Sequence, residues 1–215
     1  MSTFWILLRK DLAVEGRGRE MLPAMALLAL LLLALTGASG LRLDGAPAIL
    51  WITVAVAAAS GLGRSFLRET DQDQLQGLHL AAVDPAVLYL AKAAANFLIV
   101  AVVELVAVAA IFVFFDAPPP ADAGALAAVL LLGTAALVSL GTLLGGMLAA
   151  ARMREALLPL LLLPLGAPAV MAASGATARL LTSGGSAAGE IRLLLAFTLL
   201  FVAASVLVFE HVIEE

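Results

Sequence analysis

The sequence predicts an all-α integral membrane protein with six transmembrane helices in one domain over residues 1–215. Three observations lead to this fold class. The chain is 63% hydrophobic and only 13% charged, and its mean hydropathy is +1.11, far above that of a soluble domain. Its apolar residues form six segments, each near the roughly 20 residues that a helix needs to cross a bilayer. Its charged residues gather between these segments.

Composition also excludes several classes of function. The chain has no cysteine, so it cannot form a disulfide, a thiolate metal site or a cysteine nucleophile. A net charge of −4 without a basic block argues against nucleic-acid binding. The sequence lacks the G-x-x-x-x-G-K-[ST] loop that holds nucleotide phosphates. We therefore do not expect this chain alone to hydrolyse ATP.

The first predicted element is an amphipathic helix over about residues 4–20. Trp5, Leu8 and Leu12 recur at helical spacing, with Arg9-Lys10-Asp11 between them. This pattern is typical of a helix that lies in the membrane interface. A cleaved signal peptide is the alternative, because the next segment is apolar and ends in small residues. Against it, the stretch before that segment is long and of mixed charge.

The membrane spans are predicted at about 22–39, 47–63, 87–115, 123–150, 156–178 and 191–210. An even number of spans puts both termini on the same side of the membrane. Lys and Arg concentrate in the N-terminal segment and in the loops after the second and fourth spans. This bias predicts that both termini and the loop over 64–86 are cytoplasmic. The opposite loops are short and hold no domain.

The loop over 64–86 is the longest charged stretch of the chain, and it is predicted to contain a short helix. Asp73 followed by Gln76 is a capping-box pattern, and Leu75 and Leu78 would share one helix face. So short a helix is marginal in water and needs a partner to pack against. Asp84 before Pro85 is a predicted N-cap for the third span. The nearby acids Glu69, Asp71 and Asp73 predict a solvated or protein-docking face, and no metal site.

Two spans carry packing signals. Gly141-x-x-x-Gly145 in the fourth span is a small-xxx-small pattern that lets helix backbones approach closely. The fifth span contains Pro159, Pro164 and Pro168, which remove backbone donors and predict a bent or broken helix. Such a helix is a candidate for a moving part, and a static kink is the alternative.

Glu104 is an ionisable residue near the middle of a predicted span. If the third span enters the membrane near Lys92, Glu104 lies roughly 18 Å deep, near the bilayer centre. Because its insertion costs on the order of 3 kcal/mol, it should face protein. Two interpretations stay open. Glu104 is either a polar point on a transport path or a proton-sensitive lock, or it forms a structural hydrogen bond to another helix, with Ser139, Thr142 and Ser205 as candidate partners.

The remaining polar and soft side chains predict little chemistry. Lys92 is expected to extend its ammonium toward the cytoplasmic surface. The only histidines, His79 and His211, are predicted at that surface. Among the spans only Met25, Met147 and Met171 offer soft ligands, and lone methionines among leucines usually serve packing.

Several short motifs follow one another over most of the chain. They are Arg9-Lys10-Asp11-Leu12, Arg64-Ser65-Phe66 with Glu69, the run from Gly77 to Pro85, Tyr89-Leu90-Ala91-Lys92, Asn96-Phe97, Leu132-Gly133-Thr134, Leu140-Gly141-Thr142, and Arg154 to Leu160 with the following prolines. Taken together and in this order, they resemble the motifs of the haem exporter protein B (CcmB) family. Two positions depart from the pattern: His79 stands where an aliphatic residue is expected, and Ala82 where proline is common.

The resemblance implies the permease of an ABC exporter that takes part in cytochrome c maturation. It implies a separate ATPase subunit, CcmA, which holds ATP and Mg, a homodimer of six-helix subunits, and further membrane subunits in a bacterial inner membrane. The loop over 64–86 would be the coupling helix, with Glu69, Asp71, Asp73, Leu75, Leu78, His79 and Asp84 toward the ATPase. Residues 4–20 would form the elbow helix.

Haem iron is usually held by His, Met, Cys or Tyr, and the predicted spans contain no histidine. We therefore expect that this chain binds no cofactor alone and that a partner holds the haem. Two alternatives stay open: a permease for another small or lipid-soluble molecule, and a membrane scaffold that anchors the ATPase without transport.

Overall fold

The computed structural model describes residues 3–18, 21–40, 42–70, 84–120, 122–148, 151, 153–183 and 185–214. Within these residues the chain forms seven α-helices: α1 (Thr3–Gly18), α2 (Met21–Ala38), α3 (Ala46–Thr70), α5 (Pro85–Phe114), α6 (Ala123–Met147), α7 (Arg154–Ala178) and α8 (Ala188–Glu214). A short 3₁₀ turn, Leu43–Gly45, precedes α3, and a π-helical turn, Arg179–Ser183, follows α7.

Six helical segments are long and apolar enough to cross a membrane. They are Met21–Ala38, Leu43–Gly63, Ala86–Phe114, Ala123–Met147, Ala156–Thr182 and Ala188–Val208. The predicted all-α class and the six predicted spans are thus confirmed, with boundaries that differ by a few residues. A helix also forms where the interfacial helix is expected, but its position in a membrane interface stays a prediction. The predicted coupling helix falls on residues 71–83, outside the described residues.

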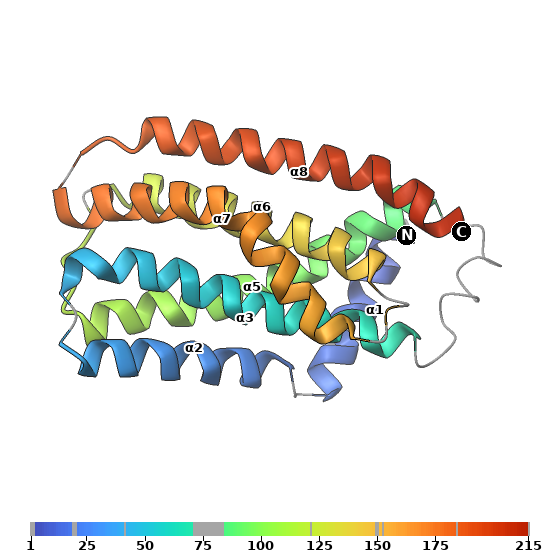
Figure 1. Cartoon of the computed structure of the whole chain (residues 1–215), viewed down its shortest axis with the longest axis horizontal. Coiled ribbons are helices and arrows are strands. Elements are labelled where there is room, and N and C mark those ends of the chain that lie inside the picture. Colours follow the sequence, from blue (N-terminus) through green and yellow to red (C-terminus); the bar gives the residue numbers. More distant parts are fainter. Residues whose placement is uncertain are drawn as a thin grey trace.

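The helices form an elongated bundle with α6 at its centre (Figure 1). α6 packs against α3, α5, α7 and α8, whereas α2 packs against α3 and α5. As a result α2 and α8 lie on opposite sides of the bundle. α1 lies at the end of the bundle where α3 ends and α5 begins, and α8 ends there too (Figure 1). This end holds the candidate site.

Small residues let the central helices approach closely. A Cβ atom added at Gly133 of α6 would overlap the ring of Trp51 from α3. One added at Gly141 would overlap Leu62 of α3. The indole of Trp51 is fully buried, and its Nε1 donates a hydrogen bond to Thr177 Oγ1 of α7 at 3.0 Å. Close backbone approach at small residues is the usual way to pack helices where lipid gives no hydrophobic driving force.

α7 contains Pro159, Pro164 and Pro168 and is nevertheless one continuous helix from Arg154 to Ala178. Figure 1 shows that it changes direction partway along its length. Each proline removes one backbone donor, and a helix that packs against neighbouring helices, as α7 does against α3, α6 and α8, tolerates this loss. The prolines therefore bend the fifth span without breaking it.

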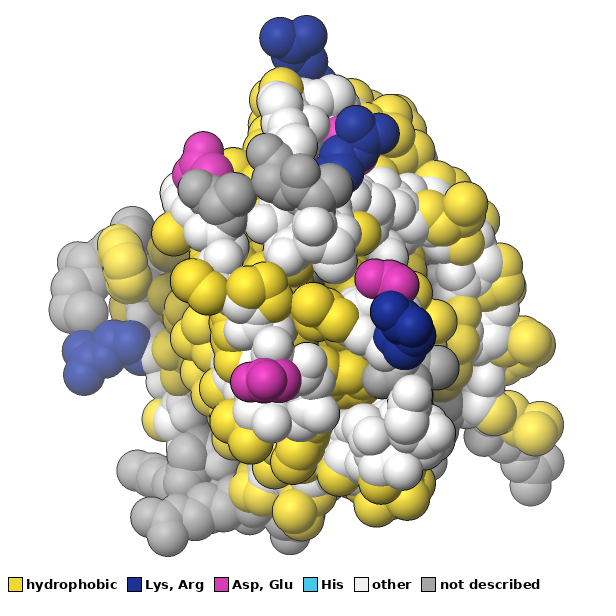
Figure 2. All heavy atoms as spheres, turned by 90° about the vertical axis from the view of Figure 1, so that its left-hand side faces the viewer, with side chains coloured by type: hydrophobic (Ala, Val, Ile, Leu, Met, Phe, Trp, Pro, Cys, Tyr) yellow, Lys and Arg dark blue, Asp and Glu magenta, His cyan; other side chains and the backbone are white. Residues whose placement is uncertain are grey.

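The opposite end of the bundle consists of short connections (Figure 1). Figure 2 shows this end with a few separated acidic and basic side chains among hydrophobic ones. One ion pair there joins Arg179 Nε to Glu190 Oε1 at 2.7 Å and ties the turn after α7 to α8. Asp122 caps α6 at this end, where its Oδ1 accepts a hydrogen bond from Ala125 N at 2.9 Å.

Candidate functional site

The candidate site begins at the first turn of α5. Asp84 is the N-cap of this helix, and its Oδ1 accepts a hydrogen bond from Ala86 N at 2.9 Å. Pro85 occupies the first helical position, where its missing N–H costs nothing. Because α5 starts directly after residues 71–83, its first turn is continuous with the stretch predicted to meet the ATPase. Glu69 belongs to the last turn of α3, while Asp71, Asp73, Leu75, Leu78 and His79 lie outside the described residues.

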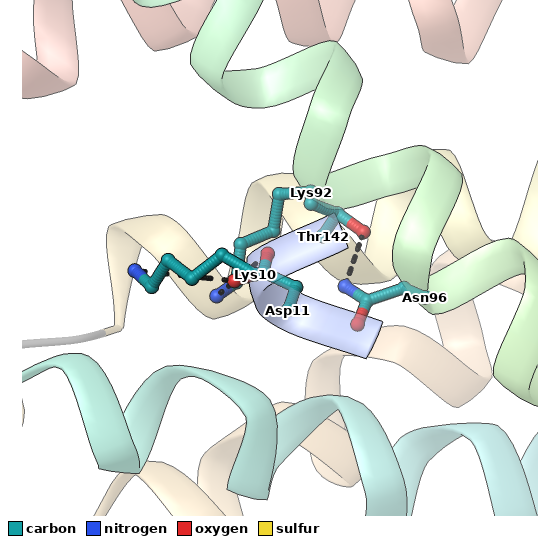
Figure 3. A network of polar contacts seen from close by, with 5 residues as sticks. All are labelled: Lys10, Asp11, Lys92, Asn96 and Thr142. Carbon is teal, nitrogen blue, oxygen red and sulfur yellow. Dashed lines mark hydrogen bonds and ion pairs between the residues drawn. The ribbon is translucent and has the colours of Figure 1, made fainter. Parts of the chain in front are cut away.

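Two turns into α5, a buried ion pair joins this helix to α1. Lys92 Nζ lies 3.7 Å from Asp11 Oδ2, and the Lys92 side chain is only 6% exposed. Lys10 Nζ lies 4.0 Å from the other oxygen of Asp11 (Figure 3). The expectation that the Lys92 ammonium extends to the surface is wrong, because α1 covers this part of α5 and supplies the carboxylate.

One turn further along α5, Asn96 connects to α6. Its Nδ2 donates a hydrogen bond to Thr142 Oγ1 at 3.1 Å, and both residues are buried (Figure 3). Tyr89 makes a second link, since its hydroxyl donates to Ser139 O of α6 at 3.1 Å. Ser205 of α8 donates to the same carbonyl at 3.3 Å. The first three turns of α5 are thus bonded to α1 on one side and to α6 on the other.

Glu104 lies deeper in the bundle and also contacts α6. Thr134 Oγ1 donates a hydrogen bond to Glu104 Oε2 at 2.8 Å. Glu104 is 4% exposed, and its Oε1 has no hydrogen-bond partner among the described residues. Sequence reasoning proposed Ser139, Thr142 or Ser205 as partners, but each of these hydroxyls is bonded elsewhere.

The contacts of Asn96 and Glu104 share one antiparallel register. From the Asn96–Thr142 pair to the Glu104–Thr134 pair, the chain advances eight residues on α5 and goes back eight on α6. At about 1.5 Å per residue the two hydrogen bonds are roughly 12 Å apart along the helix axes. These two hydrogen bonds therefore link the third and fourth spans at two positions inside the apolar core.

α1 has a second polar contact with the bundle. Glu15 is 8% exposed, and its Oε1 accepts a hydrogen bond from Leu22 N, in the first turn of α2, at 2.9 Å. A pocket of about 540 Å³ lies where α1, α2 and α5 meet. It is lined by Leu12, Glu15, Leu22, Pro23, Leu98, Ile99 and Val102.

Sequence reasoning missed Asp11, Glu15, Tyr89 and Asn96. The spacing of these residues in the sequence could have indicated them. Asp11 and Glu15 are four residues apart on the face of α1 that also carries Leu8, and Tyr89, Lys92 and Asn96 follow the i, i+3, i+7 spacing of one helix face. Polar residues that share a face within an apolar span indicate contact with protein and not with lipid.

Comparison with protein-family models decides the identity of the chain. Residues 2–214, nearly the whole length, match the model described as CcmB protein. The chain belongs to the CcmB protein family. A comparison with curated proteins gave no match. The CcmB family provides the membrane permease subunit of the ABC-type haem exporter in cytochrome c maturation, and CcmA is the ATPase of that complex. The resemblance stated above is therefore confirmed.

Membership of the CcmB family indicates that this chain works together with a separate ATPase subunit. A CcmB protein is a multi-pass membrane subunit that associates with CcmA, so ATP is hydrolysed outside this chain. The α1–α5–α6 network lies at the end of the CcmB bundle where the chain leaves α3 for residues 71–83.

Proposed function

We propose that residues 64–86 receive the movement of CcmA during its ATPase cycle and that α5 distributes this movement to α1 and α6. One observation carries the proposal. α5 begins at Pro85, within this stretch, and in its first three turns it is bonded to α1 through Lys92 and to α6 through Asn96. Any shift of the first turn of α5 must therefore strain contacts to two other helices.

Helix geometry supports this transmission. Asn96 lies about 18 Å along the axis from Asp84, at about 1.5 Å per residue. Over this length a capped helix moves as a unit, because its backbone hydrogen bonds are formed inside itself. Packed helices have discrete arrangements and do not deform continuously. A displacement of the first turn of α5 would then move α5 from one discrete packing arrangement on α6 to another.

Several features of the complex belong to the same proposal. Leu75 and Leu78 would supply the apolar contact with CcmA, and Glu69, Asp71, Asp73, His79 and Asp84 the surrounding polar contacts. Both termini and this stretch would face the cytoplasm of a bacterium, as the distribution of Lys and Arg supports. Two copies of the chain would act with two CcmA subunits and further maturation subunits in the inner membrane.

We also propose that haem, the cargo of the exporter, is held by a partner subunit. Four side chains that could ligate iron are bonded, packed or exposed on the outside of the bundle. The Tyr89 hydroxyl donates to a backbone carbonyl, the Met25 side chain packs against Gly61, and Met147 and Met171 are exposed on the outside of the bundle. The pocket between α1, α2 and α5 is lined by aliphatic residues and Glu15, none of which is a usual haem ligand.

Copurification tests the coupling proposal. In Leu75→Asp/Leu78→Asp, two carboxylates would be buried against CcmA without partners, which is costly. We expect this variant to insert normally and to lose CcmA in mild detergent. The control Ala117→Asp/Ser186→Asp adds the same two charges in connections at the other end of the bundle and should retain CcmA. Unchanged copurification of CcmA with the Leu75/Leu78 variant would refute the proposed contact.

A further inference from the structure

Hydrophobicity does not determine how α1 is rotated about its own axis. The side of α1 that faces the bundle carries Leu8 and Leu12, but its outer side carries Ile6, which is 56% exposed. Val14 on the outer side is 43% exposed. Burial of apolar surface is non-directional. A helix with apolar residues on both sides could therefore pack on α5 in more than one rotation.

Close packing does not determine the rotation either. The pocket of about 540 Å³ separates part of α1 from α2 and α5. Where side chains interlock at crystal-like density, shape alone can fix a helix. Around this pocket the aliphatic residues of α1 and α5, among them Leu12 and Ile99, leave space between them.

Polar contacts, by contrast, fit only one rotation. Asp11 and Glu15 are four residues apart, so they point the same way. Asp11 reaches Lys92 of α5, and Glu15 accepts a hydrogen bond from the first turn of α2. Turning α1 by half a revolution would separate Asp11 from the Lys92 ammonium and Glu15 from the first turn of α2. Breaking a buried ion pair is costly.

We propose that the Asp11–Lys92 ion pair fixes the rotation of α1 on α5. In this orientation α1, like α6, receives the movement of α5. In this inference, which rests on the function proposed above, Asp11 and Lys92 are positioning residues. They act by keeping α1 in the one orientation in which movement of α5 is passed to it. An ion pair that specifies one packing arrangement is a recognised use of buried charge.

The absence of cysteine from the chain allows a direct measurement. Spin labels on cysteines introduced at Ala13, on the outer side of α1, and at Leu98 of α5 report the distance between the two helices in the complex with CcmA. The variant Asp11→Asn/Lys92→Met removes both charges of the pair. We expect a longer or broader distance distribution, retained CcmA, and about tenfold lower cytochrome c maturation, within the usual range of coupling between sites.

Two further variants make the test specific. The reversed pair Asp11→Lys/Lys92→Asp should restore both the distance distribution and maturation, which a purely steric role of these residues would not produce. Lys10→Met removes a neighbouring charge that is 35% exposed and 4.0 Å from the same carboxylate, and it should behave like the wild type within about twofold.

The outcomes separate this inference from the proposed function. A wild-type distance distribution in Asp11→Asn/Lys92→Met, or no recovery in the reversed pair, would show that the ion pair does not set the rotation of α1. A changed distance distribution together with normal cytochrome c maturation would show that α1 takes no part in the coupling. Both results leave the contact of Leu75 and Leu78 with CcmA untouched, since that contact is tested by copurification.

Discussion

Thr134 donates a hydrogen bond to Glu104 inside the bundle, with Thr134 Oγ1 2.8 Å from Glu104 Oε2. This bond joins the third and fourth spans in a region where, among the described residues, Glu104 Oε1 has no partner. Together with the Asn96–Thr142 bond it fixes the register of α5 against α6. Each of the two interpretations of Glu104, a structural contact or an ionisable functional group, predicts a different response to substitution.

Glu104→Gln keeps the shape of the side chain and an oxygen that accepts the bond from Thr134, but it cannot ionise. We expect this variant to fold and to support cytochrome c maturation at close to the wild-type level, because the register of α5 and α6 is preserved. Haem staining of c-type cytochromes in cells measures the outcome. A strong loss of maturation with normal amounts of inserted protein would instead assign a function to the ionisable group.

Thr134→Val removes the donor and leaves both Glu104 oxygens buried without a hydrogen bond. Hydrogen bonds between membrane helices contribute about 0.6 kcal/mol on average and up to about 1.7 kcal/mol, so we expect a loss of about 1 kcal/mol. Thermal unfolding in detergent would measure it. Thr36→Val is a matched control, because Thr36 donates only to carbonyls of its own helix. An equal effect of the two substitutions would contradict the importance of the contact between α5 and α6.

Gly141→Ala should destabilise the bundle, because the added methyl group would overlap the buried Leu62 side chain. Overpacking of this kind costs about 1–3 kcal/mol. Adding Leu62→Ala should recover part of the loss, which a double-mutant cycle in detergent would reveal. Gly175→Ala is the control, since a Cβ there meets no atom within 4 Å. If Gly141→Ala were as stable as Gly175→Ala, the close approach of α6 to α3 would be refuted. Gly145 of the same pattern is buried as well.

Asp84→Ala removes the cap of α5 and should lower stability by about 1 kcal/mol. Asp122→Ala removes the cap of α6 at the other end of the bundle, where Asp122 makes the same kind of bond. We expect similar losses of stability in both variants but reduced maturation only in Asp84→Ala, because only Asp84 joins α5 to the coupling stretch. Measuring both quantities in both variants tests this difference. Equal maturation would argue that the start of α5 has no special role.

Haem titration of the purified subunit tests whether the chain ligates iron. We expect no low-spin Soret shift at sub-micromolar haem, since Tyr89 and Met25 are engaged in contacts within the bundle and the predicted spans contain no histidine. His79→Ala/His211→Ala removes both histidines of the chain and should give the same titration curve as the wild type. A tight low-spin complex that is lost in this variant would place a haem ligand in this subunit.

The membrane spans and the placement of Glu104 against protein could be predicted from the sequence, because both follow from hydrophobic length and the cost of a buried charge. The partner of Glu104 could not. Depth along one helix does not reveal the register of its neighbour, and that register is set by contacts such as Gly133 against Trp51 and Gly141 against Leu62. The sequence therefore does not indicate Thr134 as the partner of Glu104.

Lys92 shows a second limit of sequence reasoning. A lysine near the end of a span ordinarily extends to the surface, and the local pattern contains nothing to the contrary. Its burial follows from the docking of α1, which is distant in sequence and brings Asp11 within 3.7 Å of the ammonium. The prolines of α7 show the same limit, since local rules predict a bend or a break and only the surrounding helices decide that the helix continues.

In the function proposed above, movement of CcmA enters through residues 64–86 and shifts α5 against α6. Spin labels at Leu98 of α5 and Leu131 of α6, both exposed, would measure this shift in the complete complex with and without a non-hydrolysable ATP analogue. We predict a change in the distance between the labels when CcmA is trapped with the analogue, and no change in the Leu75→Asp/Leu78→Asp variant. An unchanged distance in the wild-type complex, or the same change in the variant, would contradict the claim.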